Sequence, residues 1–247
     1  EALERGVKVL QICEFPLLDV YSNELWKNII VNKIAKNIYT YKLKKKGSFI
    51  KLGLSNKMKT FMVIKFKKLK KIFSKKKVLL TGHTGFKGSW MLLILSFLGA
   101  KVVGVSNNEV GQLSHFGLIK RKIKFKNYYV DIRNSKGLKK IIIREKPDFI
   151  FHLAAQSLVK KSYIFPENTW TTNLNGTLNL LNILKEYKHK CTAIFITSDK
   201  VYKNLETKKP YDEKSELGGL DPYSCSKSAA DLAIQSYLKS YFTKKKK

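Results

Sequence analysis

The sequence predicts an α/β fold: a doubly wound parallel sheet with helices on both faces. Three observations predict it. From Lys77 to Tyr241, short apolar runs alternate with helix-length segments, the order expected when helical crossovers join parallel strands. Glycines recur at every third position directly after the first run. The 247 residues are 44% apolar, which provides a sizeable core and excludes a wholly disordered chain.

Five segments are predicted as strands because each is a short apolar run bordered by polar or glycine residues. These strands are expected over Lys77–Gly82, Lys101–Val105, Tyr128–Val130, Asp148–Leu153 and Ala193–Thr197. Four longer segments between and after them are predicted as helices, and the first is closed by Gly99. The helices are expected over Phe86–Leu98, Ser135–Glu145, Thr172–Tyr187 and Tyr223–Tyr241.

Charge separates the chain into two predicted parts, a lysine-rich segment over residues 1–74 with no assigned role and the α/β domain over residues 75–247. The formal net charge is +31, and no carboxylate occurs between Glu24 and Glu109. Such an excess suits a phosphate-bearing partner. Residues 61–73 mix apolar and cationic positions, as in a basic helix on a membrane or nucleic acid. We interpret the segment instead as a solvated leader, since no motif specific for nucleic acid accompanies it, and the basic helix stays the alternative.

Several classes of protein are excluded by the sequence. The three cysteines, Cys13, Cys191 and Cys225, are widely spaced and form no CxxC pair, so we expect neither a disulfide scaffold nor a metal site. The longest apolar run, Trp90–Leu98, is half the length of a transmembrane helix. No secretory signal is visible at the N-terminus. We therefore expect a cytoplasmic protein without a transmembrane segment.

The glycines after the first strand predict a dinucleotide site. Gly82 permits a tight turn, Gly85 lets backbone amides approach a pyrophosphate, and Gly88 lets the following helix lie close to the sheet. The N-terminus of that helix favours the negative charge of the phosphates. NAD is the expected cofactor. The second strand is followed by Ser106-Asn107-Asn108, which offers neither the acidic residue typical of NAD sites nor an arginine for NADP.

Tyr223 and Lys227 lie four residues apart and therefore on one face of the last predicted helix. An ammonium beside a phenol should lower the pKa of the phenol and make it a general base. Ser198, Asp199 and Lys200 follow the preceding strand at the edge where open parallel sheets bind ligands. Ser198 can share a proton with Tyr223, Asp199 can protonate a leaving group, and Lys200 can act as a base if its pKa is lowered.

Five motifs in this order resemble the extended short-chain dehydrogenase/reductases, and among them the CDP-glucose 4,6-dehydratases of bacterial surface-polysaccharide (O-antigen) synthesis. The motifs are Thr81-Gly-His-Thr-Gly-Phe-Lys-Gly-Ser-Trp90, Phe151-His-Leu-Ala-Ala-Gln156, Thr172-Asn-Leu-Asn-Gly-Thr177, Thr197-Ser-Asp-Lys200 and Leu217-Gly-Gly-Leu-Asp-Pro-Tyr-Ser-Cys-Ser-Lys227. The likeness covers about Lys75–Phe242. It implies a Rossmann-type NAD-binding domain and an NAD-dependent lyase that converts CDP-glucose into CDP-4-keto-6-deoxyglucose.

The resemblance also implies roles for individual residues. Tyr223, assisted by Lys227 and Ser198, would deprotonate the sugar 4-hydroxyl while hydride passes to NAD; water would then leave with Asp199 as the acid and Lys200 in the place of the base, and hydride would return. Gln156 and Asn173 would lie near the substrate. The residues expected to contact NAD are Gly82, Gly85, Phe86, Lys87, Gly88, Asp131, Ile132, Leu153, Ala154, Tyr223 and Lys227.

The sequence also departs from that family. Residues 1–74 match nothing in it, and the chain ends at Lys247, so we expect most of the small substrate lobe to be missing and the activity to be impaired. The full-length form is expected to be a homodimer. Two other functions stay open: another enzyme of the superfamily, such as a nucleotide-sugar 4-epimerase, or a non-catalytic basic binding protein.

Overall fold

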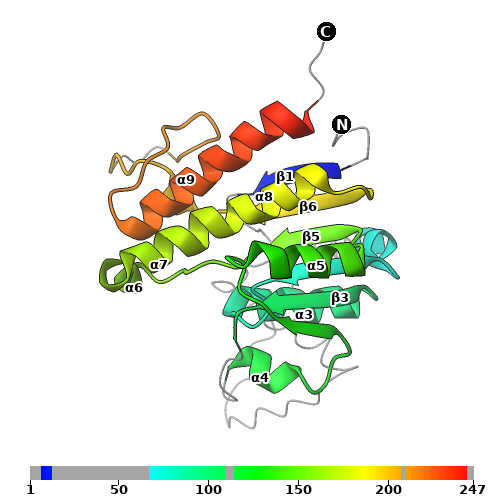
Figure 1. The fold of residues 1–247 in the computed structure, drawn as a ribbon. Helices are drawn as coiled ribbons and strands as arrows, with labels where there is room; N and C mark the ends of the chain where they lie inside the picture. Colours follow the sequence, from blue (N-terminus) through cyan, green and yellow to red (C-terminus); the bar gives the residue numbers. More distant parts are fainter. Residues whose placement is uncertain (1–6, 13–66, 109–113, 207–209, 244–247) are drawn as a thin grey trace, which may run out of the picture.

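Six parallel strands form one sheet in the order β1-β6-β5-β2-β3-β4 (Figure 1). The computed structural model describes residues 7–12, 67–108, 114–206 and 210–243. Every strand pairs in parallel with its neighbours. The strands are β1 (Val7–Ile12), β2 (Lys77–Thr81), β3 (Lys101–Ser106), β4 (Lys126–Tyr129), β5 (Phe149–His152) and β6 (Cys191–Ile196).

The five strands predicted from the sequence are confirmed, with ends that shift by one or two residues. A sixth strand, β1, was not predicted. It lies on the outer side of β6, and its register runs from the pair Val7–Cys191 to the pair Ile12–Ile196. The rest of the lysine-rich segment falls outside the described residues, except for a helical stretch over 67–73.

Helices connect the strands and follow the predicted order. They are α3 (Phe86–Phe97), α4 (His115–Ile119), α5 (Ser135–Glu145), α6 (Val159–Ile164), α7 (Pro166–Trp170), the π-helical turn η2 (Thr171–Asn175), α8 (Gly176–Glu186), the 3₁₀ turn η3 (Asp199–Val201), α9 (Pro222–Tyr237) and the π-helical turn η4 (Leu238–Phe242). The helix expected from Thr172 is preceded by α6 and α7, where Pro166 occupies a position in the first turn of α7 that tolerates proline.

Two apolar clusters cover the two faces of the sheet. One joins β1 and the central strands to α5, α8, α9 and η4, and includes Leu138, Leu180 and Ile234. The other joins the sheet to α3 and α4, and includes Met91 and Phe116. This two-sided burial explains why the central strands are nearly continuous apolar runs. The sheet with helices on both faces is the predicted doubly wound fold.

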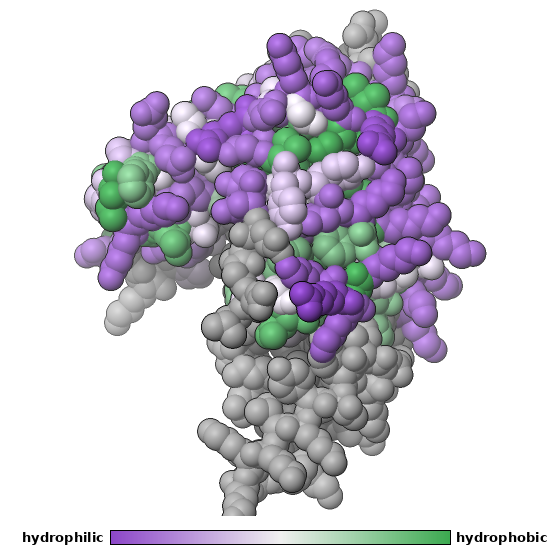
Figure 2. Space-filling view, turned by 60° about the horizontal axis from the view of Figure 1, so that its bottom comes forward, coloured by the Kyte–Doolittle hydropathy of each residue, from purple (hydrophilic) through white to green (hydrophobic). Residues whose placement is uncertain are grey.

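The surface is largely hydrophilic on the face seen in Figure 2, with apolar side chains at the end where α6 lies. Leu158, Tyr163, Ile164 and Phe165 are each more than half exposed in this region. Among the described residues, no helix combines the length and the apolar character that a bilayer crossing requires.

Candidate active site

The glycine turn joins β2 to α3 with the backbone geometry that dinucleotide-binding turns need. Gly82 has a φ of +73°, a conformation that side chains disfavour. A Cβ atom on Gly82 would lie 2.8 Å from the Ala154 nitrogen, and one on Gly88 would lie 2.0 Å from the Gly82 carbonyl oxygen. The turn therefore brings three backbone segments together more closely than any other residue type allows.

The N-terminus of α3 follows this turn and is suited to an anion. Gly85 is the N-cap, it is exposed, and it has no side chain that could cap the helix. The first turn also carries no acidic residue. Phe86 and Lys87, the first two residues of the helix, are exposed. The positive end of the helix dipole is thus available to a pyrophosphate.

Two further predicted cofactor residues lie where β5 ends, beside the glycine turn. The Leu153 and Ala154 amides each donate to Thr81 Oγ1 at 3.2 Å. Ala154 also forms the backbone wall against Gly82. Thr81 therefore ties the end of β5 to the end of β2, and these predicted cofactor residues are brought together.

Asp131 and Ile132 follow β4, and both side chains contact other residues of the protein. The Asp131 carboxylate accepts hydrogen bonds from the Arg133 guanidinium at 2.7 and 3.0 Å, and these bonds lower the pKa of Asp131. Ile132 is buried and packs on Gly176, where a Cβ would come within 2.4 Å of its side chain. At the end of β3, Ser106 Oγ lies 2.7 Å from Thr84 Oγ1.

Ser198 and Asp199 follow β6 at the carboxyl edge of the sheet. Ser198 Oγ donates to Asp199 Oδ1 at 3.0 Å and accepts a bond from the Lys200 amide at 3.2 Å. The Asp199 and Lys200 side chains are exposed. Ser198 also adjoins the Tyr223 phenol and acts to lower its pKa. The hydroxyl, the phenol and the carboxylate predicted to act together are therefore adjacent.

The Tyr223–Lys227 helix begins where the sequence predicts. Asp221 caps α9 by accepting a hydrogen bond from the Ser224 amide at 3.0 Å, and Pro222 occupies the first turn. Lys227 is 7% exposed, and its Nζ donates to the Ile196 carbonyl of β6 at 3.2 Å. This bond fixes the tyrosine helix to the strand that carries Ser198.

The expected lowering of the Tyr223 pKa is wrong for this structure. Burial of the phenol raises its pKa, the Ser198 hydrogen bond lowers it, and the Asp199 and Asp221 carboxylates raise it. The net direction is upward, because removing a phenolate from water and placing it near two negative charges outweighs the hydroxyl contact.

Gln156 and Asn173, predicted near the substrate, are engaged inside the protein. Asn173 is 1% exposed, accepts a bond from the Gln156 amide at 2.8 Å and donates to Ser226 Oγ at 2.9 Å. The Gln156 side chain donates to Thr169 Oγ1 at 2.9 Å. These contacts join the segment after β5 to η2 and α7, and η2 to α9. The expected place of both residues near the substrate stays a prediction.

Sequence reasoning missed the buried histidine at the centre of this region. His152 Nδ1 lies 2.9 Å from Thr81 Oγ1, and Nε2 lies 3.3 Å from Thr177 Oγ1. Burial, followed by the nearby Lys227 charge, lowers the pKa of His152 to about 3. His152 and Thr81 are neighbours across β5 and β2. The contact between His152 and Thr81 depends on the pairing register of β5 and β2, and a single sequence does not predict that register.

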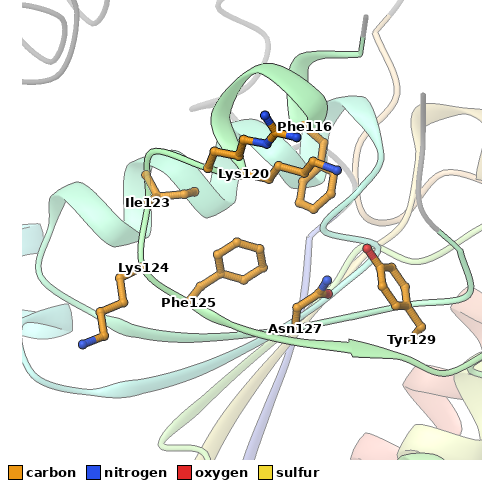
Figure 3. Close-up of a pocket in the computed structure, with 8 residues that line it drawn as sticks. Phe116, Lys120, Ile123, Lys124, Phe125, Asn127 and Tyr129 are labelled. Carbon is orange, nitrogen blue, oxygen red and sulfur yellow. The ribbon is translucent and has the colours of Figure 1, made fainter. Parts of the chain in front are cut away.

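A cavity of about 520 Å³ lies elsewhere, beside α4 and β4, and contains none of the predicted site residues (Figure 3). It is lined by Phe116, Lys120, Arg121, Ile123, Lys124, Phe125, Asn127 and Tyr129. Within the described ranges, no three His, Cys, Asp or Glu side chains gather as a metal site.

Comparison with known proteins identifies the family. The family described as GDP-mannose 4,6 dehydratase matches residues 79–244. The chain is 39% identical over 173 residues to the CDP-glucose 4,6-dehydratase of Salmonella typhimurium, covering 70% of this chain and 48% of that protein. The chain thus spans about half the length of this relative.

Two solved structures share the fold. The UDP-glucose 4-epimerase of Thermus thermophilus in complex with NAD superposes with a TM-score of 0.59 at 27% identity, over 68% of this chain and 52% of that one. The dTDP-glucose 4,6-dehydratase of Bacillus anthracis in complex with NAD gives 0.56 at 27% identity, over 68% and 52%. With the glycine turn, the Ser198–Tyr223 contact and the family match in agreement, the chain belongs to the GDP-mannose 4,6 dehydratase family of extended short-chain dehydrogenase/reductases.

Proposed function

We propose that the chain carries the NAD-binding and catalytic half of a nucleotide-sugar 4,6-dehydratase that converts CDP-glucose into CDP-4-keto-6-deoxyglucose. The observation that carries the proposal is the chain of contacts from the Tyr223 phenol through Ser198 Oγ to Asp199 Oδ1. A base for alcohol oxidation and an acid for loss of water then lie side by side. Hydride transfer alone requires only the first.

The residues around the glycine turn fit NAD. Gly85 leaves the N-terminus of α3 uncapped, and the absence of Cβ atoms at Gly82 and Gly88 lets the backbone pack closely. Leu153 and Ala154 adjoin the turn and would line the cofactor. Bound NAD supplies a reversible hydride acceptor. The NAD complexes of the two superposed enzymes support this choice.

Tyr223 is the group proposed to take the proton from the sugar 4-hydroxyl. Ser198 lies between the phenol and the Asp199 carboxylate, and its hydroxyl can relay a proton between the phenol and the sugar. Lys227 places a buried ammonium on the same helix face, held by the Ile196 carbonyl.

Asp199 and Lys200 are proposed to act in the elimination. A ketone at C4 acidifies the proton on C5, so water can leave across C5 and C6 once the C6 hydroxyl is protonated. Asp199 is exposed at the carboxyl edge of the sheet and would supply that proton. Lys200 occupies the adjacent position and would take the C5 proton. The identity of 39% with a CDP-glucose 4,6-dehydratase supports CDP-glucose as the substrate.

A nucleotide-sugar 4-epimerase is the second candidate, because the superposed Thermus enzyme is a UDP-glucose 4-epimerase. Epimerisation needs the tyrosine base but no acid for loss of water. The Ser198–Asp199 contact therefore favours the dehydratase.

The two functions differ in the mass of the product. The whole chain is incubated with CDP-glucose and NAD, and the nucleotide-sugar is analysed by mass spectrometry. We expect a product lighter by one water, lost in Tyr223→Phe. Asp199→Asn should still form the 4-keto sugar without losing water, and Glu213→Gln, an exposed carboxylate outside the site, serves as the control. A product of unchanged mass formed equally by Asp199→Asn would contradict the dehydratase.

A further inference from the structure

We propose that β1 fills the sixth-strand position of the doubly wound sheet, so that a segment N-terminal to the glycine turn covers the outer edge of β6 in the same chain. Doubly wound dinucleotide-binding sheets have the strand order 3-2-1-4-5-6. In this chain, the strands from β2 to β6 occupy positions one to five of that order. The sixth position, outside β6, is occupied by β1.

The position of β1 in the sequence makes this assignment unusual, because β1 precedes all the other strands of the sheet. A right-handed crossover through α9 would place the next strand of the chain on the outer side of β6. That edge is occupied by residues 7–12, and 64 residues, 13–76, separate them from β2 in the sequence. These residues also lie outside the matched region 79–244. Figure 1 shows β1 in blue beside β6, at the edge of the sheet.

The side chains of β1 have the pattern of a strand with one buried face. Val7 is 0% and Val9 is 6% exposed, and both belong to the core cluster that contains Cys191, Ala193 and Phe242. Lys8, between them, is exposed. This period of two matches the sheet, and a shift by one residue would bury the lysine. The docking is therefore specific in register.

Backbone pairing links β1 to the catalytic edge. Its last pair is Ile12 with Ile196, the final residue of β6. The Ile196 carbonyl accepts the Lys227 Nζ bond, and Ser198 follows two residues later. Without β1, the outer edge of β6 would present unpaired backbone groups directly before Ser198. β1 thus covers the edge of the sheet that adjoins the proposed site.

A disulfide test uses a native cysteine in the full chain. Val7 and Cys191 are direct partners, and neighbouring parallel strands lie within the Cα separation that disulfides accept. In a Cys13→Ser/Cys225→Ser background, Val7→Cys is oxidised with glutathione disulfide and analysed by non-reducing electrophoresis and peptide mapping. We expect an intramolecular bond to Cys191. The control Lys8→Cys, one residue away on the other face, should form none. Covalent dimers, no bond to Cys191, or equal bonding in both variants would overturn the proposal.

A second measurement does not depend on thiol chemistry. Val9→Asp places a charge in the core cluster, whereas Lys8→Asp places the same residue in solvent. We expect Val9→Asp to lower the thermal unfolding midpoint by at least about 5 °C and Lys8→Asp to leave it unchanged. Equal midpoints for the two variants would overturn the proposal, whatever the disulfide result.

Discussion

At the scale of single residues, His152 connects the glycine turn to the tyrosine helix. It contacts Thr81 at the end of β2 and Thr177 on α8, and it lies within reach of the Lys227 charge. Protonation would place a second cation beside that ammonium inside the core. The imidazole is therefore neutral at physiological pH, and its two nitrogens serve as hydrogen-bonding links rather than as an acid or base.

The low pKa of His152 predicts a loss of stability in weak acid. Below about pH 6.5, His152 is protonated in the unfolded chain, whereas in the folded chain it stays neutral down to about pH 3. The free energy of unfolding therefore falls as the pH decreases. The limit is about 1.4 kcal/mol per pH unit for one histidine. His152→Asn should reduce the dependence of the free energy of unfolding on pH between pH 6.5 and 5. Urea unfolding at several pH values measures this dependence. An unchanged slope in His152→Asn would contradict the prediction.

Single residues also show where one sequence was insufficient. The positions of Ser198, Asp199, Tyr223 and Lys227 could be predicted because each belongs to a local motif at the end of a strand or the start of a helix. The burial of Asn173 could not, since its partners are 17 and 53 positions away. The upward shift of the Tyr223 pKa was missed for the same reason, because burial depends on tertiary packing.

At the scale of elements, Glu145 joins the end of α5 to β4. Its side chain is 2% exposed, accepts a hydrogen bond from Tyr128 OH at 2.6 Å and pairs with Lys126 at 2.8 Å. Burial acts to raise the pKa of Glu145, but the bonds from Lys126 and Tyr128 outweigh it and the net direction is downward. The carboxylate therefore anchors β4, the strand at the edge opposite β1.

Removing this carboxylate should loosen the edge of the sheet. Glu145→Ala leaves the Tyr128 hydroxyl and Lys126 without their partner, and we expect the free energy of unfolding to fall by about 1–3 kcal/mol in chemical denaturation. Glu186→Ala is the matched control, because its pair with Lys139 is exposed on both sides. The control should unfold like the unchanged chain. Equal losses in the two variants would show that burial of the Glu145 pair contributes nothing.

The elements themselves were largely predictable. Apolar runs and glycine turns specify β2, β3, β5, β6 and their helices, because central parallel strands are buried on both faces. The packing of Gly104 could not be predicted from the sequence. The absence of a side chain at Gly104 on β3 makes room for the His83 ring, whose atoms lie 2.6 Å from where a Cβ would be. β1 was missed because its six residues carry no motif and pair with a strand 184 positions away, as in Val7 with Cys191.

At the scale of the whole molecule, the sheet brings distant segments to one edge. The ends of β2, β5 and β6 carry Thr81, His152 and Ser198, and α9 adds Tyr223 and Lys227. Contacts connect these residues in turn. They run from Thr81 through His152 to the Lys227 charge, and from Lys227 to the Ile196 carbonyl, two residues before Ser198. The proposed site is therefore a property of the fold.

Binding of NAD to the whole chain tests the central claim most directly. Gly85→Asp is the informative variant, because Gly85 has an ordinary φ of −71° at the N-cap of α3, where aspartate is well tolerated. The new carboxylate would repel a pyrophosphate at the uncapped helix end. Ser135→Asp, in the first turn of α5, is the control. Calorimetric titration should show NAD binding to the unchanged chain and to the control, weakened about tenfold or more by Gly85→Asp. Undiminished binding to Gly85→Asp, or none to the unchanged chain, would contradict the account.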